Sequence, residues 1–168
     1  VLVNVRQQDS GVCRCNVVIV NFDCSTATSF LIDLGQFSTG STSQSSSEMV
    51  AATNGEFGYT ITMSGTTLTS GNNTIPGLAG PTPSIAGTSQ FGINLRANSS
   101  PSIGAEPTGP GTGSITASYA VPNNYTFNNG DIIASSSGST DNRKYTLSYI
   151  TNISSGQAPG VYATRLTY

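Results

Sequence analysis

The sequence contains no histidine and no tryptophan, and Lys144 is its only lysine. Without histidine, neither a Ser-His-Asp triad nor a Cys-His nucleophile pair can be assembled. A serine–lysine pair would depend on Lys144, which stands in a polar stretch beside Asp141 and Asn142, where a lysine is expected to be solvated. These absences exclude the common nucleophilic hydrolase mechanisms.

Acidic residues are also few, with eight in the whole chain. Glycoside hydrolysis needs only two carboxylates at a suitable separation, so a carboxylate-dependent secreted glycosidase remains an alternative. Most of the acids, however, lie in or beside polar turns, where carboxylates are normally solvated: Glu48, Glu56, Glu106, Asp131 and Asp141. We therefore expect a protein that is not an enzyme, with no catalytic residue, no cofactor and no bound metal.

Charge of either sign is scarce, because charged residues make up 8% of the chain, against about 25% in an average soluble protein. The net charge is −2, and the arginines are scattered rather than grouped into a basic stripe: Arg6, Arg14, Arg96, Arg143 and Arg165. Nothing in this distribution favours binding to a phosphate backbone, so we expect no nucleic-acid partner.

Long hydrophobic runs are missing as well. The longest compact apolar run is Val17-Val18-Ile19-Val20, far short of the ~20 residues that span a bilayer, so we expect no membrane span. The sequence opens at Val1 without an initiator methionine, and we interpret it as the mature form of an exported protein. The expected location is extracellular: secreted, at a cell surface or in a filament.

Cysteines are present, but only three of them, and all lie near the amino terminus: Cys13, Cys15 and Cys24. In an exported protein, an odd number predicts one internal disulfide and one thiol that is free or bonded to a neighbouring molecule. Two residues at positions i and i+2 of a strand lie too far apart for easy closure, so we favour a bond from Cys24 to Cys13 or Cys15. Three thiols without a histidine fall short of the usual four zinc ligands.

Period-two alternation of apolar and polar residues recurs along the chain, while helical periodicity is almost absent. This pattern predicts an all-β, immunoglobulin-like sandwich of two sheets with about nine or ten short strands. Eleven segments carry the pattern, and the nine or ten strands are expected within them: residues 1–5, 12–22, 30–34, 56–64, 66–69, 90–98, 115–120, 125–127, 132–134, 145–150 and 161–168.

The connections between these strands are rich in serine, glycine, proline and asparagine. The low-complexity residues 38–47 predict an exposed loop. Residues 75–87 and 101–113 contain prolines that withhold backbone donors, so we expect them to cross the surface outside any ladder. Asn128-Asn129-Gly130 predicts a tight hairpin turn. We divide the chain into an amino-terminal strand and linker, residues 1–11, and one sandwich domain, residues 12–168.

Two segments resemble strands of secreted bacterial surface domains: Ala-Thr-Asn-Gly-Glu-Phe-Gly-Tyr-Thr-Ile-Thr-Met-Ser-Gly at 52–65 and Gln-Ala-Pro-Gly-Val-Tyr-Ala-Thr-Arg-Leu-Thr-Tyr at 157–168. The likeness extends to spore coat U-like and archaic chaperone–usher pilin domains, and to wall-associated domains named for a Trp-x-Leu motif. A Gly-x-Tyr-like start commonly opens the last strand of those sandwiches. This chain departs from the pattern because it has no tryptophan and because its cysteines crowd the amino terminus.

The resemblance implies assembly through an exchanged strand, in which an amino-terminal extension of one subunit adds to a sheet of the next. The donor strand would be Val1, Leu2, Val3 and Val5, with the valines as alternating knobs and residues 7–11 as a polar linker. The alternative is that residues 1–5 form an ordinary edge strand of their own domain.

These observations favour a structural subunit of an extracellular filament, such as a pilus-like fibre, or of a surface layer. Its principal partner would be further copies of itself, joined by strand complementation. The alternative is a monomeric secreted adhesin or glycan-binding module that recognises a host or surface glycan or protein receptor through residues 76–87 and 101–113. Four sequons mark candidate glycosylation sites: Asn72, Asn98, Asn124 and Asn152.

Overall fold

The computed structural model describes residues 3–8, 12–16 and 31–168, with side chains described from residue 31 onward. Apart from one short 3-10 helix, η1 (Ala117–Tyr119), all of its regular structure is β. The strands are β1 (Val3–Gln8), β2 (Val12–Asn16), β3 (Ser43–Thr53), β4 (Tyr59–Thr62), β5 (Ser64–Gly65), β6 (Thr69–Ser70), β7 (Asn73–Thr74), β8 (Thr82–Pro83), β9 (Gln90–Asn94), β10 (Asn98–Ser99), β11 (Ser102–Ile103), β12 (Ser114–Ile115), β13 (Asn124–Tyr125), β14 (Ile132–Ser136), β15 (Thr140–Asn152) and β16 (Leu166–Thr167).

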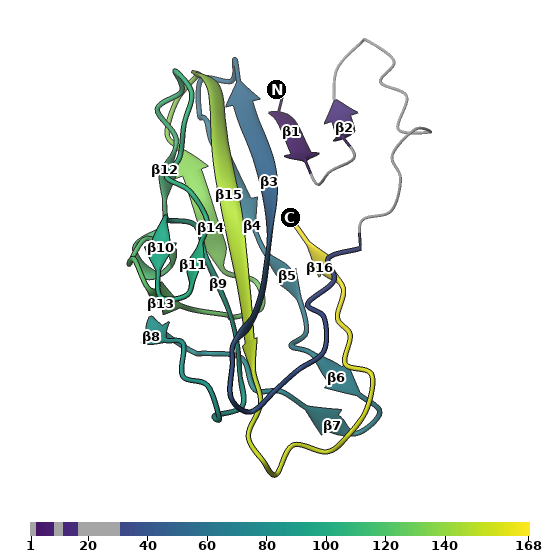
Figure 1. Cartoon of the computed structure of the whole chain (residues 1–168). Helices are drawn as coiled ribbons and strands as arrows, with labels where there is room; N and C mark the ends of the chain where they lie inside the picture. Colours follow the sequence, from purple (N-terminus) through teal and green to yellow (C-terminus); the bar gives the residue numbers. More distant parts are fainter. Residues whose placement is uncertain (1–2, 9–11, 17–30) are drawn as a thin grey trace.

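The larger sheet is antiparallel throughout, in the order β2-β1-β3-β15-β9. Its long central strands are β3 and β15, which run side by side through the molecule (Figure 1). Period-two alternation places Met49 and Ala51 of β3, and Tyr145 and Leu147 of β15, in the core.

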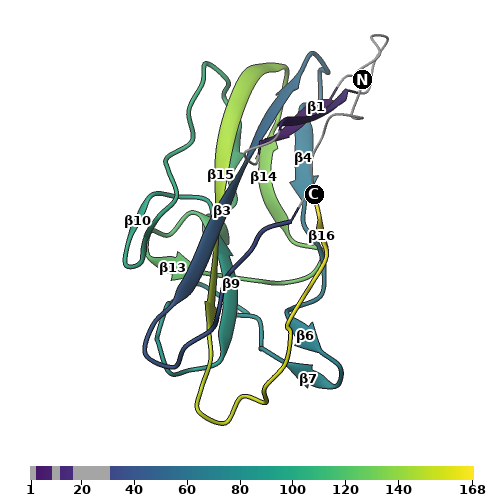
Figure 2. The same cartoon turned by 45° about the vertical axis from the view of Figure 1, so that its right-hand side comes forward.

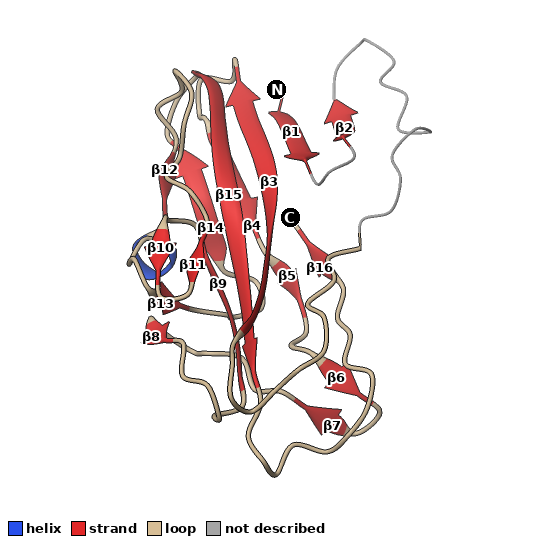
Figure 3. Ribbon diagram, in the orientation of Figure 1, coloured by secondary structure: helices blue, strands red, loops and turns tan. Residues whose placement is uncertain are grey.

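The second layer is the three-stranded sheet β12-β14-β4 (Figure 3). β5 follows β4 in the sequence and pairs with β16, and these two strands continue the layer. Ile61, Met63 and Ile133 of this layer are almost fully buried and belong to the same core cluster as the inward residues of β3 and β15. The predicted all-β sandwich is confirmed, with more and shorter strands than expected. No helix in the described residues is long and apolar enough to cross a membrane.

The prediction of an exposed loop at 38–47 was wrong for its second half, because β3 begins at Ser43. Residues Ser43 to Ser47 pair with residues 147–151 of β15. Ser47 is 2% exposed, and its hydroxyl lies 2.9 Å from the hydroxyl of Tyr149. A serine is tolerated inside the sandwich here because its hydroxyl has a partner there.

The strand predicted at 56–64 begins three residues late. Tyr59, Ile61 and Met63 are buried on one face as expected, but Phe57 is 87% exposed. Residues 55–58 form a tight turn closed by a hydrogen bond from the Gly58 amide to the Gly55 carbonyl. Gly58 has a φ of +73° and lies against the backbone of residue 136, a position that a residue with a Cβ would not fit.

Three other local predictions differ from the structure. Residues 31–34 alternate in burial but form no strand. After Ile115 the chain turns into η1, which buries Tyr119 and lets its hydroxyl donate to Asp131 at 2.9 Å. Residues 128–130 do form a turn, but the flanking strands have different partners, since β13 pairs with β8 and β14 pairs with β12 and β4.

The proline-containing connectors join the sheets, contrary to expectation. The Pro76 carbonyl accepts a hydrogen bond from the Phe91 amide at 2.8 Å, because a proline that cannot donate can still accept. Thr108 and Lys144 exchange two backbone hydrogen bonds, so residues 101–113 line the outer side of β15. Ser148 and Ile150 on that outer face are fully buried.

Candidate functional site

The amino-terminal strand, β1, lies next to the outermost strand of the larger sheet. β1 pairs with β3 of its own chain, with Val3 opposite Thr53 and Val5 opposite Ala51, and β2 pairs with the other side of β1. In this structure, residues 3–5 thus form a strand of their own domain, which is the alternative to a donor strand given above. Val1 and Leu2 lie outside the described residues.

The predicted linker at 7–11 begins inside β1 instead. Gln7 and Gln8 continue the ladder opposite Met49 and Glu48. Two polar residues can extend this strand because backbone groups make the ladder whatever the side chain. Residues 9–11 lie outside the described part of the chain.

β1 covers only half of the exposed edge of β3. It pairs with residues 48–53, whereas residues 43–47 of β3 have β15 as their only ladder partner among the described strands. Beside this uncovered half runs the segment 31–37, which we call the seam segment. In both views it starts beside β16 and leads to the beginning of β3 (Figures 1 and 2).

The seam segment buries alternate side chains against the core. Ile32, Leu34 and Phe37 pack on the core cluster, and the ring of Phe37 lies 6.4 Å from that of Tyr162 between ring centroids. Leu31, in contrast, is 73% exposed. The backbone of residues 31–37 forms no backbone–backbone hydrogen bond with the rest of the described chain.

A chain of hydroxyl groups links the two layers. The Tyr149 hydroxyl, from β15, lies 2.9 Å from Ser47 of β3 and 2.9 Å from the hydroxyl of Tyr168, which follows β16. Burial raises the pKa of Tyr168, and the neighbouring Tyr149 raises it further. With its pKa raised, the Tyr168 hydroxyl stays protonated at neutral pH and acts here as a neutral hydrogen-bonding group.

The last strand begins at a tyrosine corner. The Tyr162 hydroxyl donates to the Ala158 carbonyl at 2.7 Å and accepts from the Gln157 side-chain amide at 2.6 Å. A tyrosine that bonds back to the backbone a few residues upstream is typical of immunoglobulin-like sandwiches. Beyond it, Thr164, Leu166 and Tyr168 alternate inward as predicted, although only Leu166 and Thr167 form a ladder, with β5.

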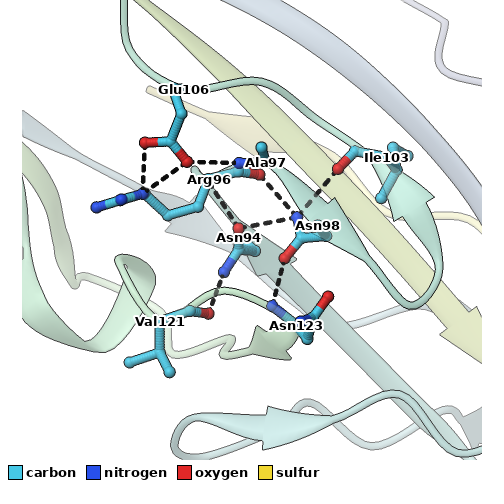
Figure 4. Close-up of polar contacts among 8 residues, drawn as sticks. All are labelled: Asn94, Arg96, Ala97, Asn98, Ile103, Glu106, Val121 and Asn123. Atoms are coloured by element: carbon cyan, nitrogen blue, oxygen red, sulfur yellow. Dashed lines mark hydrogen bonds and ion pairs between the residues drawn. The ribbon is translucent and has the colours of Figure 1, made fainter.

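A polar network beside the end of β9 holds the loops together (Figure 4). The Asn98 side-chain amide donates to the Asn94 side chain and to the carbonyls of Arg96 and Ile103. The Asn94 amide donates to the carbonyls of residues 121 and 124. These buried amide donors are directed at the protein's own loops rather than outward.

The outer part of the same network is ionic. Arg96 contacts Glu106 at 2.8 Å, and the same carboxylate accepts from the Ala97 amide at 3.1 Å. The Asn123 side-chain oxygen accepts from the amides of Ser99 and Ser100. Residues 101–113 were predicted as part of a glycan-recognition surface. Their carboxylate, that of Glu106, already binds Arg96 and the Ala97 amide.

The four sequons lie in different environments. Asn72 is exposed at the turn between β6 and β7, and Asn124 is half-buried. Asn98 is 8% exposed and Asn152 is 1% exposed, and the side-chain amides of both donate internal hydrogen bonds. In the folded protein only Asn72 and Asn124 present an accessible amide.

The cysteines fall largely outside the part of the chain whose side chains are described. Cys13 and Cys15 lie in β2, opposite Gln7 and Val5 of β1, and Cys24 lies outside the described residues. The predicted disulfide therefore stays a prediction.

Three further charged side chains, those of Lys144, Glu48 and Asp131, have partners in two separate places. Lys144 contacts Glu48 at 2.9 Å on the larger sheet, and Asp131 accepts from Tyr119 and Asn128 in a turn. Among the described residues, no three His, Cys, Asp or Glu side chains gather in a way that would hold a metal ion.

Comparison with protein-family models, with curated proteins and with solved structures found no match to this chain. The site is therefore defined by geometry alone. It consists of β1 in the outer part of the larger sheet and of a seam between the uncovered half of β3 and β16, which the seam segment covers. Sequence reasoning named the first but missed the second. The available signal was the alternation at 30–34, interpreted as an ordinary strand.

Proposed function

We propose that this protein is a structural subunit of an extracellular filament or surface layer, in which copies are joined by exchange of the amino-terminal strand. The observation that carries the proposal is the position of β1. It joins the rest of the larger sheet through β3 and carries β2 on its other side, so β2 and β1 together form the outer part of that sheet.

Backbone hydrogen bonds join β1 to β3, and the β3 strand of another copy offers the same bonds. Among the side chains that the structure describes, those of residues 31–168 form a core that spans both layers. A core of this kind and a strand joined to it at the outer part of a sheet are the two parts that strand exchange requires.

The composition supports the same function. Charged residues are scarce, and the surface polarity comes mostly from hydroxyl and amide groups, which suits close packing of like copies without charge repulsion. The carboxylates of Glu48, Glu106 and Asp131 each contact a partner in a separate part of the fold, so they do not form the facing pair that glycoside hydrolysis uses.

The test compares the intact protein with a variant that lacks residues 1–5. Intact protein should sediment as polymers and appear as fibres or sheets by electron microscopy, whereas the truncated protein should stay monomeric and folded. A variant with Val161 changed to serine is a matched control, because this exposed side chain lies far along the chain from β1. Polymers of equal length from the truncated protein would refute the proposal.

A further inference from the structure

The seam between β3 and β16 contains the edges of two strands. The seam segment covers these edges but forms no backbone ladder with either strand. Residues 43–47 of β3 have one ladder partner, β15, and β16 has one, β5, among the described strands. Unpaired strand edges are the usual sites of strand addition. The seam segment lies along them without a ladder.

We propose that this seam is an acceptor site for an extended strand of a second copy, and that the seam segment, residues 31–37, holds the site until that strand replaces it. The inference rests on the proposed function, because it supplies the acceptor for the exchanged strand. It adds a conformational step: the covering segment leaves before or while the strand enters.

The side chains of the seam segment show which pattern of apolar residues an entering strand would need. Ile32 and Leu34 are two residues apart, and both pack inward on the core, while Asp33 between them is exposed. Val1, Val3 and Val5 have the same period and comparable apolar character. An entering strand would therefore bury a similar set of side chains.

The inner face of β3 at the seam is lined by small residues. Ser43 and Ser45 are half-buried and Ser47 is buried, whereas the intervening Gln44 and Ser46 are exposed. Short side chains on this face leave space for apolar side chains from another strand. The serine-rich sequence, which resembles a linker by composition, thus forms one wall of the seam.

Backbone hydrogen bonds distinguish an entering strand from the seam segment. With the described residues the seam segment makes no ladder, and the Gly35 amide donates to its neighbour Asp33 at 2.8 Å. A strand that aligned with an open edge would keep a similar burial and add a ladder at the seam. A free peptide gains this ladder outright, whereas the β1 strand of a second copy first gives up its ladders with its own β3 and β2.

The test measures uptake of a fluorescent peptide with the sequence of residues 1–8 by the full chain. The double variant Ile32→Ser/Leu34→Ser should take up the peptide roughly tenfold faster, because the segment loses the burial that holds it. Leu31→Ser is the matched control, since Leu31 lies on the same segment but points to solvent, and its rate should not change. An unchanged or lower rate for the folded double variant would overturn the inference.

A second measurement on the unmodified protein covers the case in which the double variant does not fold. Peptide binding should slow amide exchange at Leu166 and Thr167 and speed chymotrypsin cleavage after Phe37. If the peptide binds but neither signal moves, the peptide occupies another edge, and this inference fails while the proposed function stands. If no peptide binds and the intact protein also stays monomeric, the proposed function fails.

Discussion

Gly113 shows how closely single residues are packed between the layers. A Cβ at this position would collide with the hydroxyls of Tyr59 and Tyr145, which lie 2.8 Å apart and hydrogen-bond to each other in the core. We expect Gly113→Ala to lower the free energy of unfolding by about 1–3 kcal/mol, because the tyrosine pair must shift. Urea denaturation measures the change.

The control for this prediction is Gly156→Ala, because a Cβ there meets nothing within 4 Å. The two variants should differ clearly in midpoint. If they unfold at the same urea concentration, the tyrosine pair is not packed against Gly113 as described.

Buried tyrosines make stability sensitive to alkali. Tyr125 is fully buried, its hydroxyl has no hydrogen-bond partner among the described residues, and burial raises its pKa to about 12. The unfolded chain releases this proton near pH 10, earlier than the folded protein does. Stability should therefore be level below about pH 10 and fall as the pH rises towards 12.

The variant Tyr125→Phe separates this residue from the other buried tyrosines. It should be as stable as the original protein at pH 7, or more so, because the hydroxyl that it loses has no partner. Its loss of stability between pH 10 and 12 should be shallower, as measured by urea denaturation at several pH values. A parallel loss in both proteins would contradict the assignment.

At the scale of elements, the final segment depends on the tyrosine corner. Tyr162→Phe removes the hydroxyl that bonds to Ala158 and Gln157, at a cost of about 1 kcal/mol. We expect faster amide exchange at Thr69 and Ala163, which exchange two backbone hydrogen bonds at 3.0 Å. Val161→Ala, at a position that is 88% exposed, should leave this exchange unchanged.

Elements with apolar alternation could be predicted from the sequence, and polar ones could not. Tyr59, Ile61 and Met63 indicated a strand because burial of one face needs every second residue to be apolar. Ser43 to Ser47 carried no such signal, because their ladder and the Ser47 hydroxyl bond depend on β15, about a hundred residues later in the chain.

The candidate site could be predicted only in part for the same reason. The alternation at Val1, Val3 and Val5 indicated a strand, but the same pattern serves pairing within a chain or between chains. Burial of Asn98 and Asn152 arises from packing with residues distant in the sequence, so their sequons look identical to the accessible one at Asn72. The seam itself is visible only when β3, β16 and residues 31–37 are brought together.

At the scale of the whole molecule, the described part of the sandwich has one side whose strand edges are paired with loops and another whose strand edges are paired less completely. Residues 101–113 line the outer side of β15, and residues 76–78 pair with β9 and its neighbour Phe127, so these edges have partners. The opposite side carries β1 and the seam segment (Figure 2). Contacts between copies should therefore concentrate on that side.

The most direct measurement asks which copy receives the amino-terminal strand. Assemblies grown from an equal mixture of 13C-labelled and 15N-labelled protein can be examined by solid-state NMR for contacts between the two labels. The account predicts contacts between residues 1–8 of one copy and the sheet of another. An intact protein that stays monomeric at high concentration, with residues 3–8 still paired to β3 of the same chain, would contradict it.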